Sequence, residues 1–336
     1  MERREFIARL VAMGLTAAAG IAFAEDAPAP APKLPRRPFK PGGPELSIIG
    51  FGGLLLRGME QQQANDIVAW AVDRGVNYYD VAPSYGDSQD LLGPALEPYR
   101  DDCFLACKTT KRDAAGARAE LEGSLAALRT DHLDLYQLHA LTKLEDVDTV
   151  FGPGGAMETF RAARDDGTVR HIGFSAHSEA AALAALDRFD FDSVLFPINC
   201  VCIENGGFGP AVIAKAAETA TTILAIKGLA WRPVTDASDR PYPNCWYRPV
   251  QDPDVARLAL GYTLDQPIAA AVSPAAAALL MLAAEVGRRY RPLTDAERAD
   301  LLARIEGVPP IFPQSVSYTH LRAHETVLAL VCRLLL

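Results

Sequence analysis

The amino-acid sequence predicts an α/β fold, a (β/α)₈ TIM barrel that forms a single domain. Eight short apolar runs alternate with stretches of helical periodicity, an alternation typical of a parallel sheet with helices in its crossovers. About 246 residues lie between Leu46 and Arg291, which matches eight strand–helix units of about 30 residues each. Asp80, Lys108 and His139 end three of the first four runs, where a barrel of this class places its chemistry.

The predicted strands are short runs rich in Val, Ile, Leu and Phe, the composition of strands that are buried on both faces. In chain order these runs are Ser47–Phe51, Val76–Asp80, Phe104–Lys108, Leu133–His139, Arg170–Phe174, Ser193–Pro197, Thr222–Lys227 and Ile268–Val272. Helical periodicity is clearest over residues 115–128, where apolar residues recur at spacings of three and four. Residues 293–305 predict a final helix outside the barrel, capped by Thr294 or Asp295.

A doubly wound sheet is the competing architecture. It normally carries a Gly-x-Gly-x-x-Gly turn directly after its first strand. The stretch Gly50-Phe51-Gly52-Gly53 lacks that spacing, which favours the closed barrel.

Residues 1–24 are similar to a twin-arginine export signal. Arg3-Arg4 precedes an uncharged stretch at residues 10–23, and Ala22-Phe23-Ala24 has the small-x-small form of a cleavage site. We therefore expect the twin-arginine export machinery as a partner, cleavage near Ala24 and a periplasmic location. The alternative is a short membrane anchor, but the stretch is too short and too weakly apolar to span well, so we expect no stable membrane span in the mature chain.

The rest of the chain divides into a linker, the barrel and a tail. Residues 25–45 hold seven prolines among 21 residues, which predicts an extended linker. The barrel is expected over residues 46–306, followed by a tail at 307–336. Within this tail, residues 317–336 resemble a translated sequencing adapter, and the alternative is a genuine closing helix.

Composition excludes some classes of function. The chain carries a net charge of −9, which argues against nucleic acid as a partner, because phosphate binding needs a basic surface. The cysteines show no ligand spacing, so we expect reduced residues in the core and no metal site.

Four residues in the first half of the chain carry the functional signal. Asp80 and Tyr85 stand five apart after the second predicted strand, Lys108 ends the third, and His139 ends the fourth. Taken singly, each has a structural explanation as a cap, a surface residue, a solvated strand end or a buried core histidine. Together they predict one site at the carboxyl end of the barrel.

The pattern resembles the aldo/keto reductase family, whose tetrad of Asp, Tyr, Lys and His falls on Asp80, Tyr85, Lys108 and His139. The resemblance extends through Leu92-Gly93 and through Gly167–Ser175, and covers roughly residues 46 to 306. It implies an NAD(P)-dependent oxidoreductase that transfers a hydride between a nicotinamide cofactor and an aldehyde, ketone or sugar carbonyl.

In such an enzyme Tyr85 would be the general acid and base. A free phenol has a pKa of about 10, which is too high for efficient proton exchange at neutral pH. A nearby Lys108 would lower that pKa, Asp80 would hold the ammonium in place, and His139 would donate a hydrogen bond to the substrate oxygen.

The resemblance also implies contacts to NADP(H) or NAD(H). The residues expected to form them are Gly52, Gly53, Ser175, Ile226, Lys227, Gly228 and Leu229. The glycines have an equal structural explanation as a tight barrel turn, and Lys227 could reach either a phosphate or the substrate pocket. The segment after the eighth strand has no cation at residues 273–278, so a preference for NADPH is unsupported.

Two polar positions of the family's cofactor site are changed. Ala176 stands where relatives carry an asparagine, and Leu195 replaces an expected glutamine, with His177 as a candidate substitute. The alternative function is therefore a non-catalytic nicotinamide-binding or regulatory protein on the same barrel.

Residues 231–248 form a long loop rich in aromatic residues and arginine, which predicts either a lid over the site or a surface flap.

Overall fold

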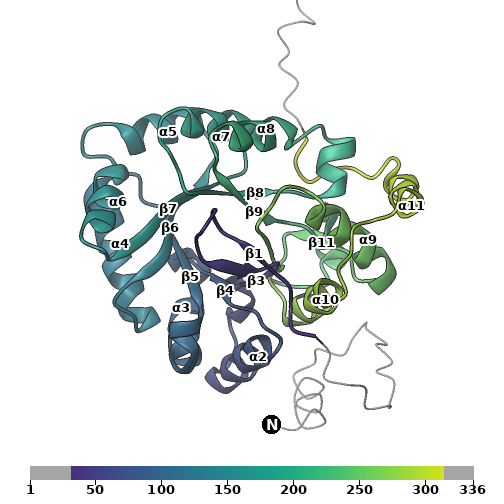
Figure 1. Ribbon diagram of the computed structural model, residues 1–336, viewed down its shortest axis with the longest axis horizontal. Coiled ribbons are helices and arrows are strands. Elements are labelled where there is room, and N and C mark those ends of the chain that lie inside the picture. Colours follow the sequence, from purple (N-terminus) through teal and green to yellow (C-terminus); the bar gives the residue numbers. More distant parts are fainter. Residues whose placement is uncertain (1–31, 314–336) are drawn as a thin grey trace, which may run out of the picture.

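The computed structural model describes residues 32–313, which Figure 1 shows as one barrel ringed by helices. The predicted signal peptide and the adapter-like residues 317–336 lie outside the described residues. Within residues 32–313, no helix has the length and apolarity needed to cross a membrane.

Eight parallel strands close the barrel in the order β12-β3-β4-β5-β6-β7-β8-β9. Their bounds are β3 Ile49–Gly52, β4 Tyr78–Asp80, β5 Phe104–Thr109, β6 Leu133–Leu141, β7 Val169–Ala176, β8 Ser193–Pro197, β9 Thr222–Ile226 and β12 Ala270–Val272. The prediction of a TIM barrel is confirmed, and each predicted strand overlaps one of these eight.

Helices surround the barrel and cover the outer faces of its strands (Figure 1). They are α2 Gln61–Asp73, α3 Ser88–Leu96, α4 Ala114–Leu128, α5 Leu144–Phe151, α6 Ala156–Asp165, α7 Glu179–Leu186, α8 Pro210–Glu218, α9 Pro253–Leu264, α10 Ala277–Arg288 and α11 Asp295–Ile305. Short turns of other helix types are η1 Gly53–Leu56, η2 Pro83–Tyr85, η3 Glu97–Asp102, η4 Val201–Asn205 and η5 Ala237–Asp239. The helix predicted at residues 115–128 is α4, whose first turn is capped by Asp113.

Side chains from alternate strand positions fill the barrel interior. This interior cluster includes Tyr78, Phe104, Leu135, Leu195 and Leu224. Because side chains along a strand point to the same face at every second residue, Asp80, Lys108 and His139 share the inward face of their strands. They form the layer above the apolar interior, at the carboxyl end of the barrel.

A hairpin closes the opposite end. β1 (Arg36–Pro38) pairs antiparallel with β2 (Glu45–Ser47), and Figure 1 shows it crossing the barrel. Phe39 is 1% exposed and packs into the interior cluster, with its ring centroid 5.0 Å from that of Phe104. The folded domain therefore begins before the predicted boundary at residue 46. A run of prolines is compatible with this hairpin because its strands are edges, where a missing N–H is tolerated.

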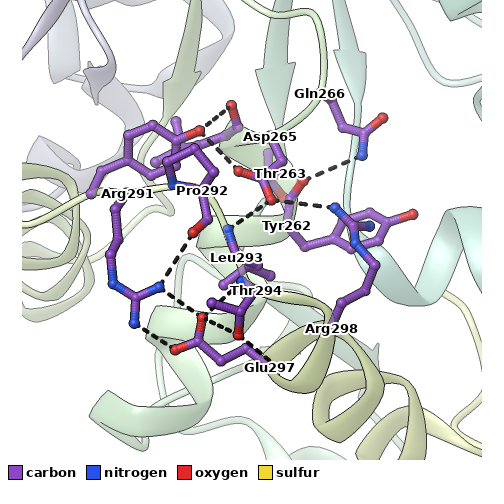
Figure 2. Close-up of polar contacts among 12 residues, drawn as sticks. Tyr262, Thr263, Asp265, Gln266, Arg291, Pro292, Leu293, Thr294, Glu297 and Arg298 are labelled. Carbon is purple, nitrogen blue, oxygen red and sulfur yellow. Dashed lines mark hydrogen bonds and ion pairs between the residues drawn. The ribbon is translucent and has the colours of Figure 1, made fainter.

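The predicted final helix is α11, which is held to α9 by a polar network (Figure 2). Thr294 and Glu297 form a capping box at its start. Asp265, just after α9, accepts hydrogen bonds from the Tyr290 hydroxyl at 2.9 Å and from Arg298 at 3.3 Å. These contacts dock α11 outside the barrel, as the sequence predicts.

Candidate active site

The structure brings the four predicted catalytic residues together at the carboxyl end of the barrel. Asp80 is the last residue of β4, Tyr85 ends η2, and Lys108 and His139 lie near the ends of β5 and β6. The Lys108 ammonium lies 4.9 Å from the centre of the Tyr85 ring. The rings of Tyr85 and His139 are 5.6 Å apart and nearly perpendicular, at 83°.

Asp80 and Lys108 form a buried ion pair. Their side chains are 3% and 1% exposed, and Lys108 Nζ donates to Asp80 Oδ1 and, at 3.1 Å, to the Val81 carbonyl. Burial alone would lower the pKa of Lys108, but the charge of Asp80 and the neighbouring Tyr85 raise it above its ordinary value. The lysine is therefore a fixed cation beside the phenol ring.

The second oxygen of Asp80 has partners that the sequence reasoning missed. Gln137 donates from Nε2 to Asp80 Oδ2 at 3.0 Å, and the Tyr78 hydroxyl lies 3.4 Å from the same oxygen. A signal for Gln137 was available, because it stands two residues before His139 on β6 and so shares its inward face. The carboxylate is held on both oxygens.

The net pKa shift of Tyr85 is opposite to the expected one. Burial raises the pKa of Tyr85 above its ordinary value, and the lowering effect of Lys108 is smaller. The ammonium acts in the predicted direction, but desolvation of a phenolate at this site costs more than the cation offsets. In this state the phenol keeps its proton.

His139 is held as a neutral imidazole. Burial comes first among the causes that lower the pKa of His139 to about 2, followed by the positive charge of Lys108. The Ser84 hydroxyl lies 3.2 Å from His139 Nδ1. When Ser84 donates this bond, the ring proton is on Nε2, which can then donate to a ligand oxygen. Nothing in the spacing of the sequence singled out Ser84.

The predicted glycines are explained by packing. A Cβ at Gly52 would lie 2.4 Å from the Ser273 carbonyl oxygen, and one at Gly53 would lie 2.8 Å from a Val81 methyl group. These clashes are with the protein's own atoms, so the tight-turn explanation accounts for both residues. A role for them in cofactor binding stays a prediction.

Ser175, near the end of β7, lies beside an unusual set of neighbours. Its Oγ accepts from the Ala140 N–H at 2.7 Å, which leaves the hydroxyl proton for a ligand acceptor. Ala176 and Leu195 are buried and apolar. Nε2 of His177 is buried with no hydrogen-bond partner among the described residues, and its ring stacks on Phe312 at 5.3 Å. Burial first, and then the charge of Lys227, lower the pKa of His177 to about 4.

The remaining predicted cofactor residues lie together at the end of β9. Ile226 is half-buried and packs against the barrel interior cluster, and Gly228 and Leu229 are buried. Lys227 has a positive φ of 67°, which is uncommon for a residue with a side chain. Its ammonium lies 5.0 Å from the centre of the Tyr247 ring.

The long loop predicted at residues 231–248 is bounded by a two-stranded ribbon. β10 (Ala230–Pro233) pairs antiparallel with β11 (Tyr247–Pro249). Asp239 lies between two of the loop's arginines, 2.8 Å from Arg232 Nη2 and 2.7 Å from Arg248 Nη1. The loop is thus tied together by its own charges.

The described residues hold no group of three or more His, Cys, Asp or Glu placed to bind a metal ion. The five cysteines within residues 32–313 are buried and unpaired.

Sequence comparison finds similarity to one family over the first part of the barrel. A family model described as the aldo/keto reductase family matches residues 48–205, which contain the four clustered residues. The aldo-keto reductase YhdN of Bacillus subtilis is 33% identical over 152 residues, 40% of this chain and 44% of that protein. The 6-dehydroglucose reductase of Novosphingobium aromaticivorans is 28% identical over 218 residues, 57% of this chain and 66% of that protein. Over residues 48–205, a little under half of its length, the chain is similar to the aldo/keto reductase family. The first curated relatives are matched over about half of their length, 45% and 44%.

Solved aldo/keto reductase structures share the fold. The holo form of AKR11C1 from Bacillus halodurans superimposes with a TM-score of 0.65 at 22% identity, covering 83% of this chain and 98% of that one. An aldo/keto reductase from Klebsiella pneumoniae, in complex with NADP and acetate, gives a TM-score of 0.62 at 20% identity, covering 84% and 98%. At these identities the likeness shows the fold alone.

Proposed function

We propose that the protein is an oxidoreductase that transfers a hydride between a nicotinamide cofactor and an aldehyde, ketone or sugar carbonyl. The observation that carries the proposal is the buried Asp80–Lys108 pair beside the Tyr85 ring, with the His139 ring 5.6 Å from that of Tyr85. An ion pair buried in this way is costly to maintain, and perturbed titratable groups gathered at one end of a barrel mark a functional site.

Tyr85 is proposed to exchange the proton with the substrate oxygen. In the reductive direction its hydroxyl gives up the proton that burial keeps on it in the free protein. The Lys108 ammonium then stabilises the phenolate that remains, and Asp80 keeps the ammonium in position. General acid catalysis of this kind contributes about 10²–10⁴-fold to a rate.

His139 is proposed to orient the substrate. Its neutral imidazole, with Ser84 on Nδ1, leaves Nε2–H to donate to the carbonyl oxygen. A donor aimed at an oxygen that gains negative charge in the transition state lowers the barrier.

The residues present fit a nicotinamide cofactor. Ser175 offers a hydroxyl proton, His177 has a buried nitrogen without a partner among the described residues, and Ile226 offers an aliphatic face. Gly52, Gly53, Gly228 and Leu229 complete the proposed contacts. When bound, the nicotinamide supplies a hydride, which no amino-acid side chain can do. The NADP complex of the Klebsiella neighbour supports this class of cofactor, in either the NAD(H) or the NADP(H) form.

Relatives favour a small carbonyl or a sugar as the substrate. Their printed names include 6-dehydroglucose reductase, D-threo-aldose 1-dehydrogenase from a Pseudomonas species and the methylglyoxal reductase YeaE of Escherichia coli.

A second candidate is a binding protein that performs no chemistry. Ala176 and Leu195 favour it, because two buried apolar side chains stand where relatives hold the cofactor with amides. The buried Asp80–Lys108 pair opposes it, since binding alone does not require a cation held beside a phenol.

The two candidates are separated by one series of measurements. Fluorescence titration with NADH and NADPH measures cofactor binding, and loss of nicotinamide absorbance with aldehydes and sugars measures turnover. We expect Tyr85→Phe to lower kcat by about 10²–10⁴-fold while nucleotide affinity is kept, and Tyr99→Phe, on η3, to serve as the matched control. Nucleotide binding without consumption of any carbonyl would establish the binding protein instead.

We also propose that the chain is exported by the twin-arginine route to the periplasm and cleaved near Ala24. The paired Arg3-Arg4 and the short uncharged stretch after them support this. Replacing both arginines with lysine should retain the protein in the cytoplasmic fraction. Equal distribution of the two forms after fractionation would contradict export by this route.

A further inference from the structure

Lys227 is a cation at the mouth of the barrel that the proposed proton chemistry does not use. It follows β9 directly, with a backbone φ of 67°. A side chain in that conformation costs free energy, and such costs are commonly tolerated where the residue serves a site.

No carboxylate pairs with Lys227 within the part of the chain that the structure describes. Its ammonium instead lies over two aromatic rings, 5.6 Å from the centre of Trp246 and 5.0 Å from that of Tyr247. Asp239, an acid of the loop at residues 231–248, is already engaged, because it binds both Arg232 and Arg248. The lysine therefore lacks a counter-ion of its own.

The ammonium acts electrostatically on the proposed catalytic centre. Burial first, and then the charge of Lys108, lower the pKa of Lys227 to about 8, with Cys245 opposing. Lys227 in turn contributes to the lowered pKa of both His139 and His177. A half-buried cation without a counter-ion is stabilised by an anion that binds next to it.

We propose that Lys227 binds an anionic group of the substrate, a carboxylate or a phosphate, while the carbonyl end of the same molecule lies at Tyr85 and His139. Lys227 directly follows β9, so it lies at the same carboxyl end of the barrel at which β5 and β6 present Lys108 and His139. This inference rests on the proposed function, and it selects acidic aldehydes, keto acids or acidic sugars over their neutral counterparts.

A matched pair of aldehydes tests the proposal. Succinic semialdehyde carries a carboxylate, and butyraldehyde has the same number of carbon atoms without one. The quantity to measure is the ratio of kcat/KM for the acid to that for the neutral aldehyde, which cancels any general effect of a substitution.

We expect Lys227→Met to lower this ratio by about 10- to 100-fold, the effect of one hydrogen bond to a charged group, and Lys227→Arg to retain most of it. Lys143→Met removes an exposed lysine after β6 and should leave the ratio as it is. A ratio that Lys227→Met leaves unchanged would overturn the proposal, including the case in which nucleotide affinity falls and both aldehydes suffer equally.

Calorimetry with succinate gives a readout that needs no turnover. Wild-type protein loaded with nucleotide should bind succinate about tenfold or more tightly than Lys227→Met does, and equal affinities would refute the inference. If the wild-type protein reduces no carbonyl at all, the proposed function fails, while this titration still decides the role of Lys227.

Discussion

Gln137 holds the oxygen of Asp80 that Lys108 leaves free. Its Nε2 donates to Asp80 Oδ2 at 3.0 Å, while the lysine bonds to Oδ1. With a donor on each oxygen, the carboxylate is fixed in rotation. Gln137 is thereby a positioning residue for the ammonium beside Tyr85.

Replacing Gln137 should affect turnover more than binding. Gln137→Met keeps the length of the side chain but removes the donor, so Asp80 holds Lys108 less firmly and kcat should fall about tenfold, with KM nearly constant. Steady-state kinetics measure both constants. A purely structural role for Gln137 would instead lower thermal stability and leave kcat per folded molecule intact.

Two histidines should make stability depend on pH. His139 and His177 have pKa values lowered to about 2 and about 4 in the folded protein, against about 6.5 in an unfolded chain. Between pH 6.5 and 4 the unfolded chain therefore binds more protons, and the free energy of unfolding should fall as the pH falls, by up to about 1.4 kcal/mol per pH unit for each histidine. Urea denaturation across this range measures the slope.

The contribution of one histidine can be isolated. His177→Phe preserves stacking on Phe312 but cannot take up a proton. The slope of the unfolding free energy against pH should therefore decrease by the contribution of one histidine. An unchanged slope would mean that His177 does not lose its proton on folding.

Residues just after α11 should contribute to stability, whereas the last residues should not. Phe312 stacks on Phe208 at 5.3 Å and contacts Trp246 at 5.6 Å, and Asn205 donates to the Val308 carbonyl at 2.8 Å. A chain that ends at residue 306 loses these contacts and should unfold with about 2–4 kcal/mol less free energy.

A chain that ends at residue 316 is the matched control. It keeps Phe312 and removes the segment that resembles a translated adapter, so its melting temperature should equal that of the full chain. A large loss in this shorter deletion would show that residues 317–336 belong to the protein.

Asp239 should keep the β10–β11 loop closed. Hydrogen bonding from Arg232 holds the pKa of Asp239 below its ordinary range. Asp239→Asn weakens the bonds to both arginines, so chymotrypsin, which cleaves after aromatic residues such as Trp246, should cut the loop several-fold faster. KM should rise as well if the loop covers the site. Asp236→Asn, an exposed change in the same loop, is the control. Equal proteolysis of the two variants would show that the contacts of Asp239 with Arg232 and Arg248 do not hold the loop together.

The sequence predicted the barrel because its signals are local. Runs such as Leu133–His139 are long and apolar enough to identify buried strands. The carboxyl ends of parallel strands meet at one rim, so Asp80, Lys108 and His139 could be placed together without coordinates. The same reasoning extends to Gln137 once the alternation along β6 is followed inward.

Features that depend on packing could not be predicted in this way. The hairpin that begins at Arg36 has strands of three residues and several prolines, and only the position of Phe39 in the barrel interior explains it. The pKa of Tyr85 depends on the balance between burial and the charge of Lys108. A sequence gives the charge but not how deeply the Tyr85 side chain is buried. Ser84 reaches His139 across 55 residues of sequence, a pairing that no spacing rule indicates.

The β1–β2 hairpin, which closes the end of the barrel opposite the site, also determines how the molecule can be attached to other structures. Leu34 hydrogen-bonds to the Arg74 carbonyl at 2.9 Å, on the side where the strands begin, so any fusion partner joined ahead of residue 32 meets the barrel at its sealed base. Tethering through that side leaves the rim with Tyr85 facing outward, open to incoming molecules.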